Sequence, residues 1–303
     1  MQTNYLRYMV EIERTRSITQ AAANLFLTQP SLSRILHDLE SQLGYVLFER
    51  TNRGVRPTEA GTAFLRHAKR VLSEMEAIES LGHGKRPPDR FRVCMPRSAG
   101  ILELAAAYLE GLPGSQSLDA MLRECHVRQA FDYLASGEAD LGIIRFRAEY
   151  QGFFEDQARE QRLGFQAMNR YRYRIILRRD NPLAERASIG VADLSGLTEI
   201  THGDTFRNQA TPAGPARRIY SVDRYAQLTL LTRIPNAFMW VTSMRQQTLD
   251  AWGLVQRQVT DNRVVYQNAL IHIAPELLND IETRFMAYVL ERCGGKTGET
   301  ILP

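Results

Sequence analysis

The sequence predicts an α/β protein that begins with a mainly helical domain. Two observations carry this expectation. Between Ser17 and Gly61, two short helix patterns are followed by a basic hairpin, and from Phe91 onward strand patterns alternate with helix patterns. A run rich in glycine and proline at residues 82–88 separates the two regions and predicts a domain boundary. The length of 303 residues also fits two domains.

The first two helices are short and amphipathic. The first is expected from about Asn4 to Arg14, and the second from about Thr19 to Leu25. Consecutive alanines at residues 21–23 keep the second helix thin, so that a neighbouring helix can cross it closely. Residues 26–28 form the turn that follows.

The third helix carries the polar chemistry of this region. Thr28 is a suitable N-cap, and Pro30 is tolerated in the first turn because the first N–H groups of a helix have no intrahelical partner. The helix ends at Gly44, which suits a left-handed cap. Arg34 points away from the apolar face, so the exposed first turns carry short polar groups and one long cation. Such groups can reach base edges and phosphates in a DNA groove.

A basic hairpin follows, with a turn at Thr51–Gly54 whose Asn and Gly residues suit a tight connection. Arg53 lies at its tip, where it can enter a minor groove or contact a phosphate. A small helical packing unit with a solvated turn is the alternative interpretation. The capped helix, hairpin and arginine tip occur in order, which favours DNA binding.

The stretch resembles the N-terminal winged helix-turn-helix of the LysR-type transcriptional regulators. The blocks typical of that family are matched at Ser17–Ala22, Leu25–Ile35, Leu39–Arg50 and Arg53–Gly61, although Glu13 and Arg16 stand where small or apolar residues are more usual. From the residue chemistry and the resemblance together, we expect DNA contacts from Thr28, Gln29, Pro30, Ser31, Ser33, Arg34, His37, Arg50 and Arg53.

A long helix capped by Thr58 is expected to extend to Leu81. Apolar residues recur along it at steps of 4 and 3, as in a heptad seam, at Phe64, Ala68, Val71, Met75 and Ile78. The helix could pack on its own domain, but the seam continues beyond the head, so pairing with a second copy is favoured. The resemblance implies the same. We therefore expect a homodimer or homotetramer, with residues 1–57 as the winged head, 58–83 as the linker and dimerisation helix, and 84–90 as a hinge.

The alternating pattern from Phe91 predicts parallel sheets with helical crossovers. Strands are expected at residues 91–95, 118–124, 140–144, 164–168, 173–177, 199–200 and 269–273, and a final helix at 275–292. The region resembles the family's effector-binding domain, which has two α/β lobes like those of type 2 periplasmic binding proteins. The resemblance implies a first lobe at about 91–161 and 267–303 and a second lobe at 162–266.

Ligands of parallel sheets bind beyond the carboxyl ends of strands, near helix N-termini. Two polar loops hold such positions, one after the first strand and one after the short strand at 199–200. On this ground we expect effector contacts from Arg97, Ser98, Thr201 and His202, and the free N–H groups with Arg97 favour an anionic effector. The alternatives are a Ser98 that only caps its helix and solvated side chains at Arg97 and His202.

The three cysteines, Cys94, Cys125 and Cys293, lack the short spacing of a zinc site or a disulfide framework. We expect Cys94 and Cys125 in the core. Some relatives sense oxidants with a cysteine pair in the second lobe, but this chain has no cysteine between Cys125 and Cys293. No motif for catalysis, a cofactor or a metal is found, so an enzyme is not expected.

Composition is compatible with a DNA-binding protein. The net charge of +4 suits a nucleic-acid partner without demonstrating one. No signal-peptide pattern opens the sequence, and no stretch approaches the roughly 20 apolar residues of a membrane span. A cytoplasmic location without membrane contact is expected.

Together these features predict a sequence-specific transcription regulator that binds double-stranded operator DNA, contacts RNA polymerase and responds to a small-molecule effector between two lobes. One alternative is a ligand-independent DNA-binding regulator whose sensor domain serves only oligomerisation, because residues 233–241 depart from the family pattern. Another is an enzyme or solute-binding protein with an appended head.

Overall fold

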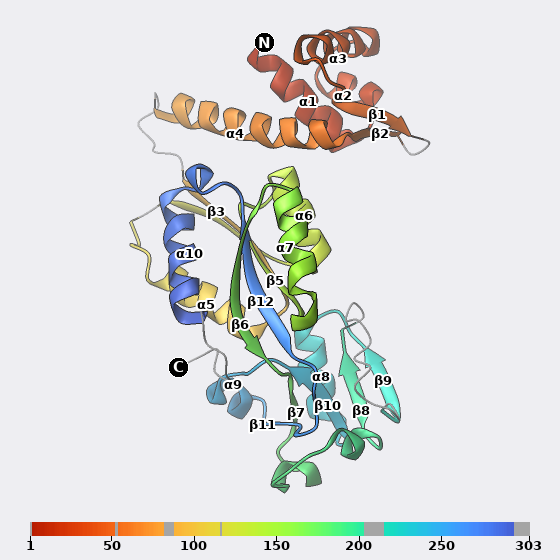
Figure 1. Cartoon of the computed structure of the whole chain (residues 1–303), viewed down its shortest axis with the longest axis vertical. Coiled ribbons are helices and arrows are strands. Elements are labelled where there is room, and N and C mark those ends of the chain that lie inside the picture. The colour runs from red at the N-terminus through yellow and green to blue at the C-terminus, as the bar shows by residue number, and fades with distance from the viewer. Residues whose placement is uncertain (1, 52–53, 82–87, 116, 203–214, 294–303) are drawn as a thin grey trace. The chain divides into compact units, whose positions relative to one another are not determined.

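The computed structural model describes residues 2–51, 54–81, 88–115, 117–202 and 215–293 (Figure 1). The chain forms two compact units. The first comprises Met1–Val93, Pro113–Met121 and Phe131–Asp140, and the second comprises Cys94–Leu112, Leu122–Ala130 and Leu141–Pro303.

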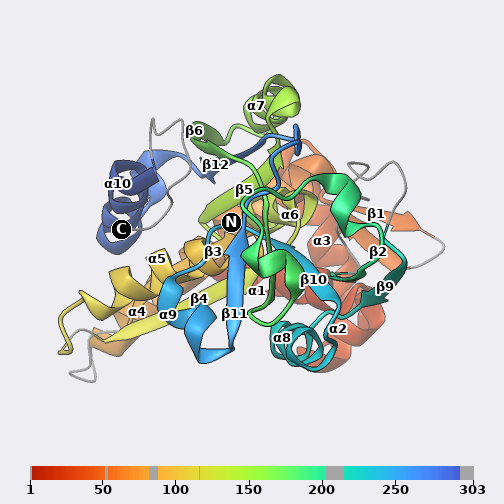
Figure 2. The same ribbon diagram turned by 90° about the horizontal axis from the view of Figure 1, so that it is seen from below.

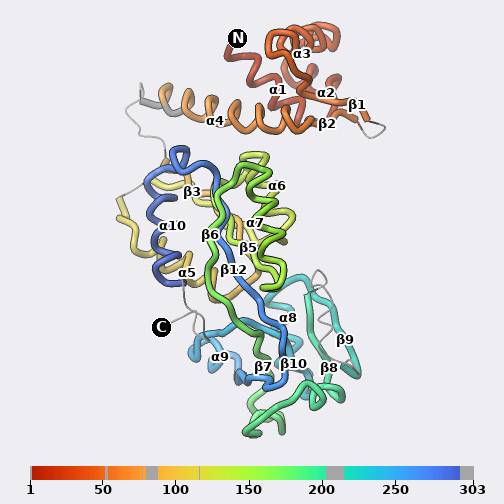
Figure 3. Tube along the Cα trace, viewed as in Figure 1, coloured from red at the N-terminus to blue at the C-terminus, as the bar shows by residue number. Residues whose placement is uncertain are grey.

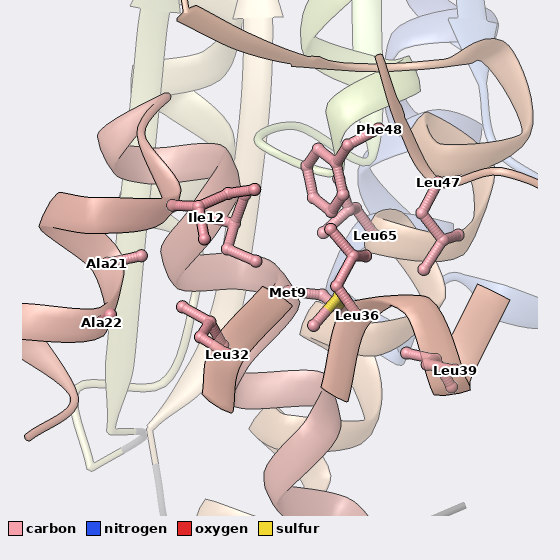
Figure 4. Packing of buried hydrophobic residues seen from close by; sticks show 11 residues of the cluster. Met9, Ile12, Ala21, Ala22, Leu32, Leu36, Leu39, Leu47, Phe48 and Leu65 are labelled. Carbon is pink, nitrogen blue, oxygen red and sulfur yellow. The ribbon is translucent and has the colours of Figure 1, made fainter. Parts of the chain in front are cut away.

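The first unit begins with a head of three helices, α1 (Thr3–Thr15), α2 (Ile18–Asn24) and α3 (Gln29–Leu43). Their apolar faces meet in one core, which Figure 4 shows from close by. Ala21 and Ala22 are buried, as the expected close helix crossing requires. The fully buried larger side chains of this core are Met9, Ile12, Leu32, Leu39, Leu47 and Leu65.

The helix ends of the head lie within a residue of the predicted positions, because local signals set them. The Ser17 hydroxyl accepts a hydrogen bond from the Gln20 N–H at 3.2 Å and starts α2. The Thr28 hydroxyl accepts from the Ser31 N–H at 3.4 Å and starts α3. Gly44 ends α3 with φ of 79°, a left-handed conformation that glycine adopts without strain.

The hairpin consists of β1 (Phe48–Thr51) and β2 (Gly54–Pro57), paired antiparallel. Its base lies against the corner between α1 and α2, where the Val55 N–H donates to the Arg16 carbonyl at 2.9 Å. Gly54 has φ of 109°, and a Cβ atom there would lie 2.5 Å from the same carbonyl oxygen. Glycine is therefore required for this contact. The predicted tip residue Arg53 lies outside the described residues.

The long helix α4 (Glu59–Leu81) starts at the predicted cap, because the Thr58 hydroxyl accepts from the Gly61 N–H at 2.9 Å. A salt bridge of 2.8 Å joins Glu13 of α1 to Lys69 of α4, which gives the unusual Glu13 a structural partner. Figure 3 shows α4 running past the helices of the head.

The predicted apolar seam on α4 divides into two parts. Phe64 packs against the core of the head, and Ala68 is buried. Val71 and Ile78 are 46% and 66% exposed. The head therefore uses the first part of the seam, and the second part is exposed on the single chain.

Two five-stranded sheets follow. The first has the order β4-β3-β5-β12-β6 and the second the order β11-β7-β10-β8-β9. The strands of the first are β3 (Asp89–Met95), β4 (Leu118–Glu124), β5 (Leu141–Arg147), β6 (Gly164–Tyr171) and β12 (Tyr266–His272). Those of the second are β7 (Arg174–Arg178), β8 (Thr198–Thr201), β9 (Arg217–Tyr220), β10 (Ala237–Val241) and β11 (Leu254–Arg257).

The expectation of parallel sheets is correct only in part. The strand β8 pairs parallel with both β9 and β10, whereas β7 pairs antiparallel with β10 and β11. The strand β12 is antiparallel to both of its neighbours, β5 and β6. The second sheet is therefore mixed, and the first contains two antiparallel pairs in place of the parallel ones expected.

The strand β6 departs from the expected division into lobes. We expected residues 164–168 to open the second lobe, but β6 pairs with β12 in the first sheet. The pairing brings Gly164 opposite His272, and a Cβ atom on Gly164 would lie 2.2 Å from the His272 ring. The chain passes to the second sheet between β6 and β7. An alternating apolar pattern fits either sheet, so it could not make this distinction.

Helices of the second unit are α5 (Ala99–Glu110), α7 (Gln151–Glu160), α8 (Arg224–Arg233), α9 (Gln246–Ala251) and α10 (Asp280–Cys293), while α6 (Val127–Ser136) spans the boundary between the units. Short 3-10 turns lie at Ala148–Tyr150, Pro182–Glu185, Val191–Leu194 and Pro275–Leu277. In Figures 1 and 2, α5 and α10 lie side by side, and the Tyr108 hydroxyl donates to the Ile281 carbonyl at 2.7 Å. The predicted apolar face of the last helix is confirmed, since Ile281, Phe285 and Val289 are buried.

The aromatic segment that departs from the family pattern forms β10, in the middle of the second sheet. Met239 belongs to a core on one face of this sheet, and Phe238 to a core on the other. Because both faces are covered, the strand is almost continuously apolar.

Candidate DNA-binding surface and effector site

The start of α3 presents short polar side chains in a fixed arrangement. The Thr28 and Ser31 hydroxyl oxygens are 2.8 Å apart, and the Gln29 amide donates to the Ser33 hydroxyl at 2.7 Å. Pro30 is exposed beside them. These contacts order the groups that the sequence predicts to meet DNA.

Exposed basic side chains flank this polar surface. Arg34, His37 and Arg50 are exposed, and within the described parts of the chain none of them makes a hydrogen bond or an ion pair. Arg56 on β2 has the same character. A guanidinium that is not neutralised by a carboxylate is available to a phosphate or a base edge.

Glu40 fixes the start of the hairpin relative to α3, a role that the sequence analysis missed. Its carboxylate accepts hydrogen bonds from the Leu47 N–H at 2.6 Å and the Phe48 N–H at 3.2 Å. A lone acidic residue on a helix gives no signal of such a contact, because its partners come from a following loop. The contact ties the start of the hairpin to α3.

In the second unit, Ser98 occupies the expected position after β3. Its hydroxyl accepts from the Ile101 N–H at 3.5 Å at the start of α5 and lies 3.2 Å from the Thr242 hydroxyl. Both side chains are buried. Thr242 follows β10 and was not predicted, although β10 runs parallel to β8, so their carboxyl ends share one edge of the sheet.

The structure brings two separately predicted residues together. The Arg97 guanidinium contacts the His202 imidazole, and Arg97 Nε lies 3.6 Å from the Glu124 carboxylate. A ring nitrogen of His202 also donates to the Val222 carbonyl at 2.7 Å. The Thr201 hydroxyl donates to the His202 carbonyl at 3.4 Å.

Beside Arg97 lies a cluster that the sequence analysis did not identify. Arg145 Nη1 donates to the Arg97 carbonyl and to the Tyr173 hydroxyl, each at 3.0 Å. The guanidinium carbon lies 5.8 Å and 5.7 Å from the ring centroids of Tyr171 and Tyr173. Burial raises the pKa of the Tyr171 phenol, so this group stays neutral. Arg145 directly follows the expected strand 140–144, and a polar residue at a strand end was the available signal.

Cys94 and Cys125 form a hydrogen-bonded thiol pair that the sequence spacing did not reveal. The hydrogen bond to Cys125, together with burial, raises the pKa of the Cys94 thiol. The same bond, aided by the charge of Arg123, lowers the pKa of Cys125. Cys94 is buried as expected, whereas Cys125 is only half-buried, because it lies just beyond the end of β4. Neither cysteine is in a disulfide.

The described residues contain neither a metal-binding cluster nor a membrane-spanning helix. No cluster of three His, Cys, Asp or Glu side chains there could hold a metal ion. None of the helices in the same ranges combines the length and apolar character needed to cross a membrane.

Residues 3–62 match the family model described as bacterial regulatory helix-turn-helix protein, lysR family. The chain is 30% identical over 165 residues to the HTH-type transcriptional regulator ClcR of Pseudomonas putida. It is 27% identical over 215 residues to the DNA-binding transcriptional dual regulator OxyR of Escherichia coli. These alignments cover 54% and 68% of this chain, and 56% and 65% of the two relatives. The chain thus spans less than two thirds of the length of either relative.

Solved structures share the fold over almost the whole chain. ArgP from Mycobacterium tuberculosis has a TM-score of 0.66 at 15% identity and covers 98% of both chains. CbnR complexed with its target DNA has a TM-score of 0.52 at 20% identity, covering 96% of this chain and 99% of that one. The winged head and the α/β sheets define a helix-turn-helix regulator fold. With the family match over the head, residues 3–62 form a helix-turn-helix domain of the lysR family.

Proposed function

We propose that the chain is a sequence-specific DNA-binding transcription regulator controlled by a small molecule bound between two α/β lobes. One observation carries the DNA-binding part. The polar start of α3 and the exposed arginines Arg34 and Arg50 lie on a head whose hairpin is fixed to α3 through Glu40. The match of residues 3–62 to a regulatory helix-turn-helix family supports the same function.

In this proposal the groups predicted from the sequence keep their roles. Residues at the start of α3 read bases, and arginines of the hairpin contact phosphates. Two heads, joined through the exposed part of α4, bind one operator as a homodimer or within a tetramer, and the regulator acts on RNA polymerase in the cytoplasm. The effector contacts Arg97, Ser98, Thr201 and His202.

Selection of DNA fragments from the source genome, followed by binding titrations, tests the DNA-binding part. We expect enriched fragments with a shared sequence and a steep loss of affinity as the salt concentration rises, since phosphate contacts release counterions. Binding that does not discriminate between an enriched fragment and a scrambled one would contradict sequence-specific recognition.

A ligand-independent regulator is the second candidate, and a specific observation favours it. Ser98 and Thr242 satisfy each other, and Arg97 contacts His202, so groups predicted to bind an effector already have protein partners. Thermal unfolding in the presence of fractionated metabolites separates the two candidates. Stabilisation by a fraction supports effector control.

A further inference from the structure

The loop between α3 and the hairpin is bonded to two helices. On one side, the Glu40 carboxylate of α3 accepts from the Leu47 N–H at 2.6 Å and from the Phe48 N–H at 3.2 Å. On the other side lies the start of α4. There the Thr58 hydroxyl donates to the Val46 carbonyl at 2.7 Å, and the Thr58 N–H donates to the Leu47 carbonyl at 3.0 Å. These three loop residues therefore form a junction between the two helices.

The first turn of α4 lies directly against this junction. Gly61 is buried, and a Cβ atom there would lie 1.9 Å from the Leu47 carbonyl oxygen. No side chain fits at that separation, so only glycine allows the helix to approach so closely. The Thr58 hydroxyl accepts from the Gly61 N–H at 2.9 Å while it donates to Val46. One side chain thus caps α4 and ties it to the junction.

The hydrogen bonds of the junction restrict the angle between the helices in a way that apolar contacts do not. Phe64 and Leu65 hold α4 close to the core of the head, but the burial of apolar surface is not directional. Hydrogen bonds prefer a nearly straight geometry and weaken steeply when they are bent. Leu47 donates toward α3 and accepts from the start of α4. A change in the angle between the two helices must therefore bend or break at least one of these bonds.

The angle between α3 and α4 has a consequence for DNA binding. On the proposed function, α3 reads DNA and the exposed part of α4 joins two chains. The direction of α3 relative to α4 then determines how far apart the two recognition helices lie in a dimer. Dimers of helix-turn-helix proteins bind half-sites whose separation matches that of their recognition helices. The junction therefore relates a helix angle to a length of DNA.

We propose that Glu40 and Gly61 are positioning residues that fix the direction of α3 relative to α4, and that they thereby set the spacing of the two half-sites that one dimer binds. This inference rests on the proposed function and adds to it the residues that determine operator spacing. Neither residue is a DNA contact in this assignment. Gly61 is buried, and the Glu40 carboxylate is engaged by two backbone N–H groups and has the same sign of charge as a phosphate.

The test uses the full chain and DNA fragments enriched from the source genome. The distance between the half-sites is changed in steps of one base pair, and a further fragment keeps a single half-site. Fluorescence anisotropy measures the affinity for each fragment. For the wild type we expect a loss of about tenfold or more when the spacing changes by about two base pairs, because the second head no longer reaches its half-site. A wild type that binds every spacing equally well would overturn the inference, whether or not any variant folds.

Variants of Glu40 assign the spacing preference to the junction. Glu40→Ala removes the acceptor of both N–H groups, whereas Glu40→Gln keeps an acceptor oxygen. We expect Glu40→Ala to reduce the preference for the native spacing by about tenfold, while the affinity for a single half-site changes by less than about twofold. Glu40→Gln should restore most of the preference. Glu49→Gln is the matched control, because it removes the same charge from an exposed position on β1 and should leave the preference unchanged.

Gly61→Ala perturbs the same junction from the side of α4. Its new methyl group forces the start of α4 away from Leu47, so the preferred spacing should change in the same assay. Circular dichroism checks that each variant folds. A folded Glu40→Ala with the wild-type spacing preference would refute the assignment. Equal losses on the single half-site and on the complete fragment would also refute it, because they would show an effect on the head alone.

The wild-type titrations separate this inference from the proposed function. Sequence-specific binding with a spacing preference that neither Glu40→Ala nor Gly61→Ala alters removes the junction and leaves the regulator function standing. A single half-site bound as tightly as the pair has the same meaning, because a second head then contributes nothing. Absence of sequence-specific binding by the wild-type chain removes the regulator function itself.

Discussion

The hydroxyl of Ser98 lies 3.2 Å from the hydroxyl of Thr242. Ser98 starts α5 after a strand of the first sheet, and Thr242 follows a strand of the second sheet. The two side chains are 2% and 4% exposed. A contact between two buried hydroxyls therefore joins elements of the two sheets.

We expect Ser98→Ala to lower the free energy of unfolding by about 1–2 kcal/mol, because it removes a helix cap and leaves the Thr242 hydroxyl buried without its partner. Thr242→Val should also destabilise the domain. Since the residues share one contact, the double variant should lower the free energy of unfolding by less than the sum of the two single losses. Urea denaturation of all three variants measures this coupling, and strict additivity would show that the two hydroxyls act independently.

Two arginines of the head should differ in their effect on DNA binding. Arg34→Ala is expected to cost roughly 1–3 kcal/mol on a specific site and to reduce discrimination against other sequences. Arg50→Ala should weaken specific and non-specific binding alike. It should also reduce the slope of log affinity against log salt concentration by about one. Fluorescence anisotropy with matched and scrambled DNA distinguishes the two. Arg14→Ala is the control, since Arg14 already pairs with Glu11.

Cys125 should be the more reactive member of the thiol pair. Its pKa is lowered by the hydrogen bond with Cys94, so its thiolate forms at a lower pH than that of an ordinary cysteine, whose pKa is about 8.5. At neutral pH, iodoacetamide should therefore label Cys125 before Cys94. Cys94→Ala removes the hydrogen bond, which should move the pH at half-maximal labelling upward. Peptide mass spectrometry over a pH series provides the measurement. Faster labelling of Cys94 would contradict the assigned roles.

The exposed part of α4 should hold two chains together. Val71→Asp combined with Ile78→Asp places charge on the apolar surface that a partner would cover, so we expect a monomer with weaker DNA binding. The head should remain folded, because neither residue belongs to its core. Sedimentation measures the oligomeric state, and circular dichroism checks the fold. A variant that sediments as the wild type does would exclude this surface as the contact.

The head could be predicted closely because its signals are local. Thr28, Gly44 and Thr58 act on groups within a few residues, so their roles as caps follow from the sequence. Strand partners are set by distant contacts. The pairing of β6 with β12 joins segments about a hundred residues apart, and no local pattern specifies it.

The candidate effector site was predicted less completely for the same reason. The loops after two strands were expected to converge, and the contact between Arg97 and His202 agrees with that. Thr242 was missed because the parallel pairing of β10 with β8 cannot be read from either segment alone. Arg145 was missed because its strand extends to Arg147, past the apolar residues that marked it. Whether a polar residue in a strand is buried can be decided only when its neighbours in space are known.

The core of the head is complete at Leu65, before the exposed part of α4 begins. A fragment ending near Arg70 would therefore keep every residue of that core and none of the exposed apolar side chains that follow. On the proposed function, such a fragment reports the intrinsic affinity of one head for one half of an operator. The affinity of the full chain for the whole operator, compared with that of the fragment, then gives the effective concentration of the second head once the first has bound. On the proposed function, recognition thus resides in the head and avidity in the part of α4 that follows Arg70.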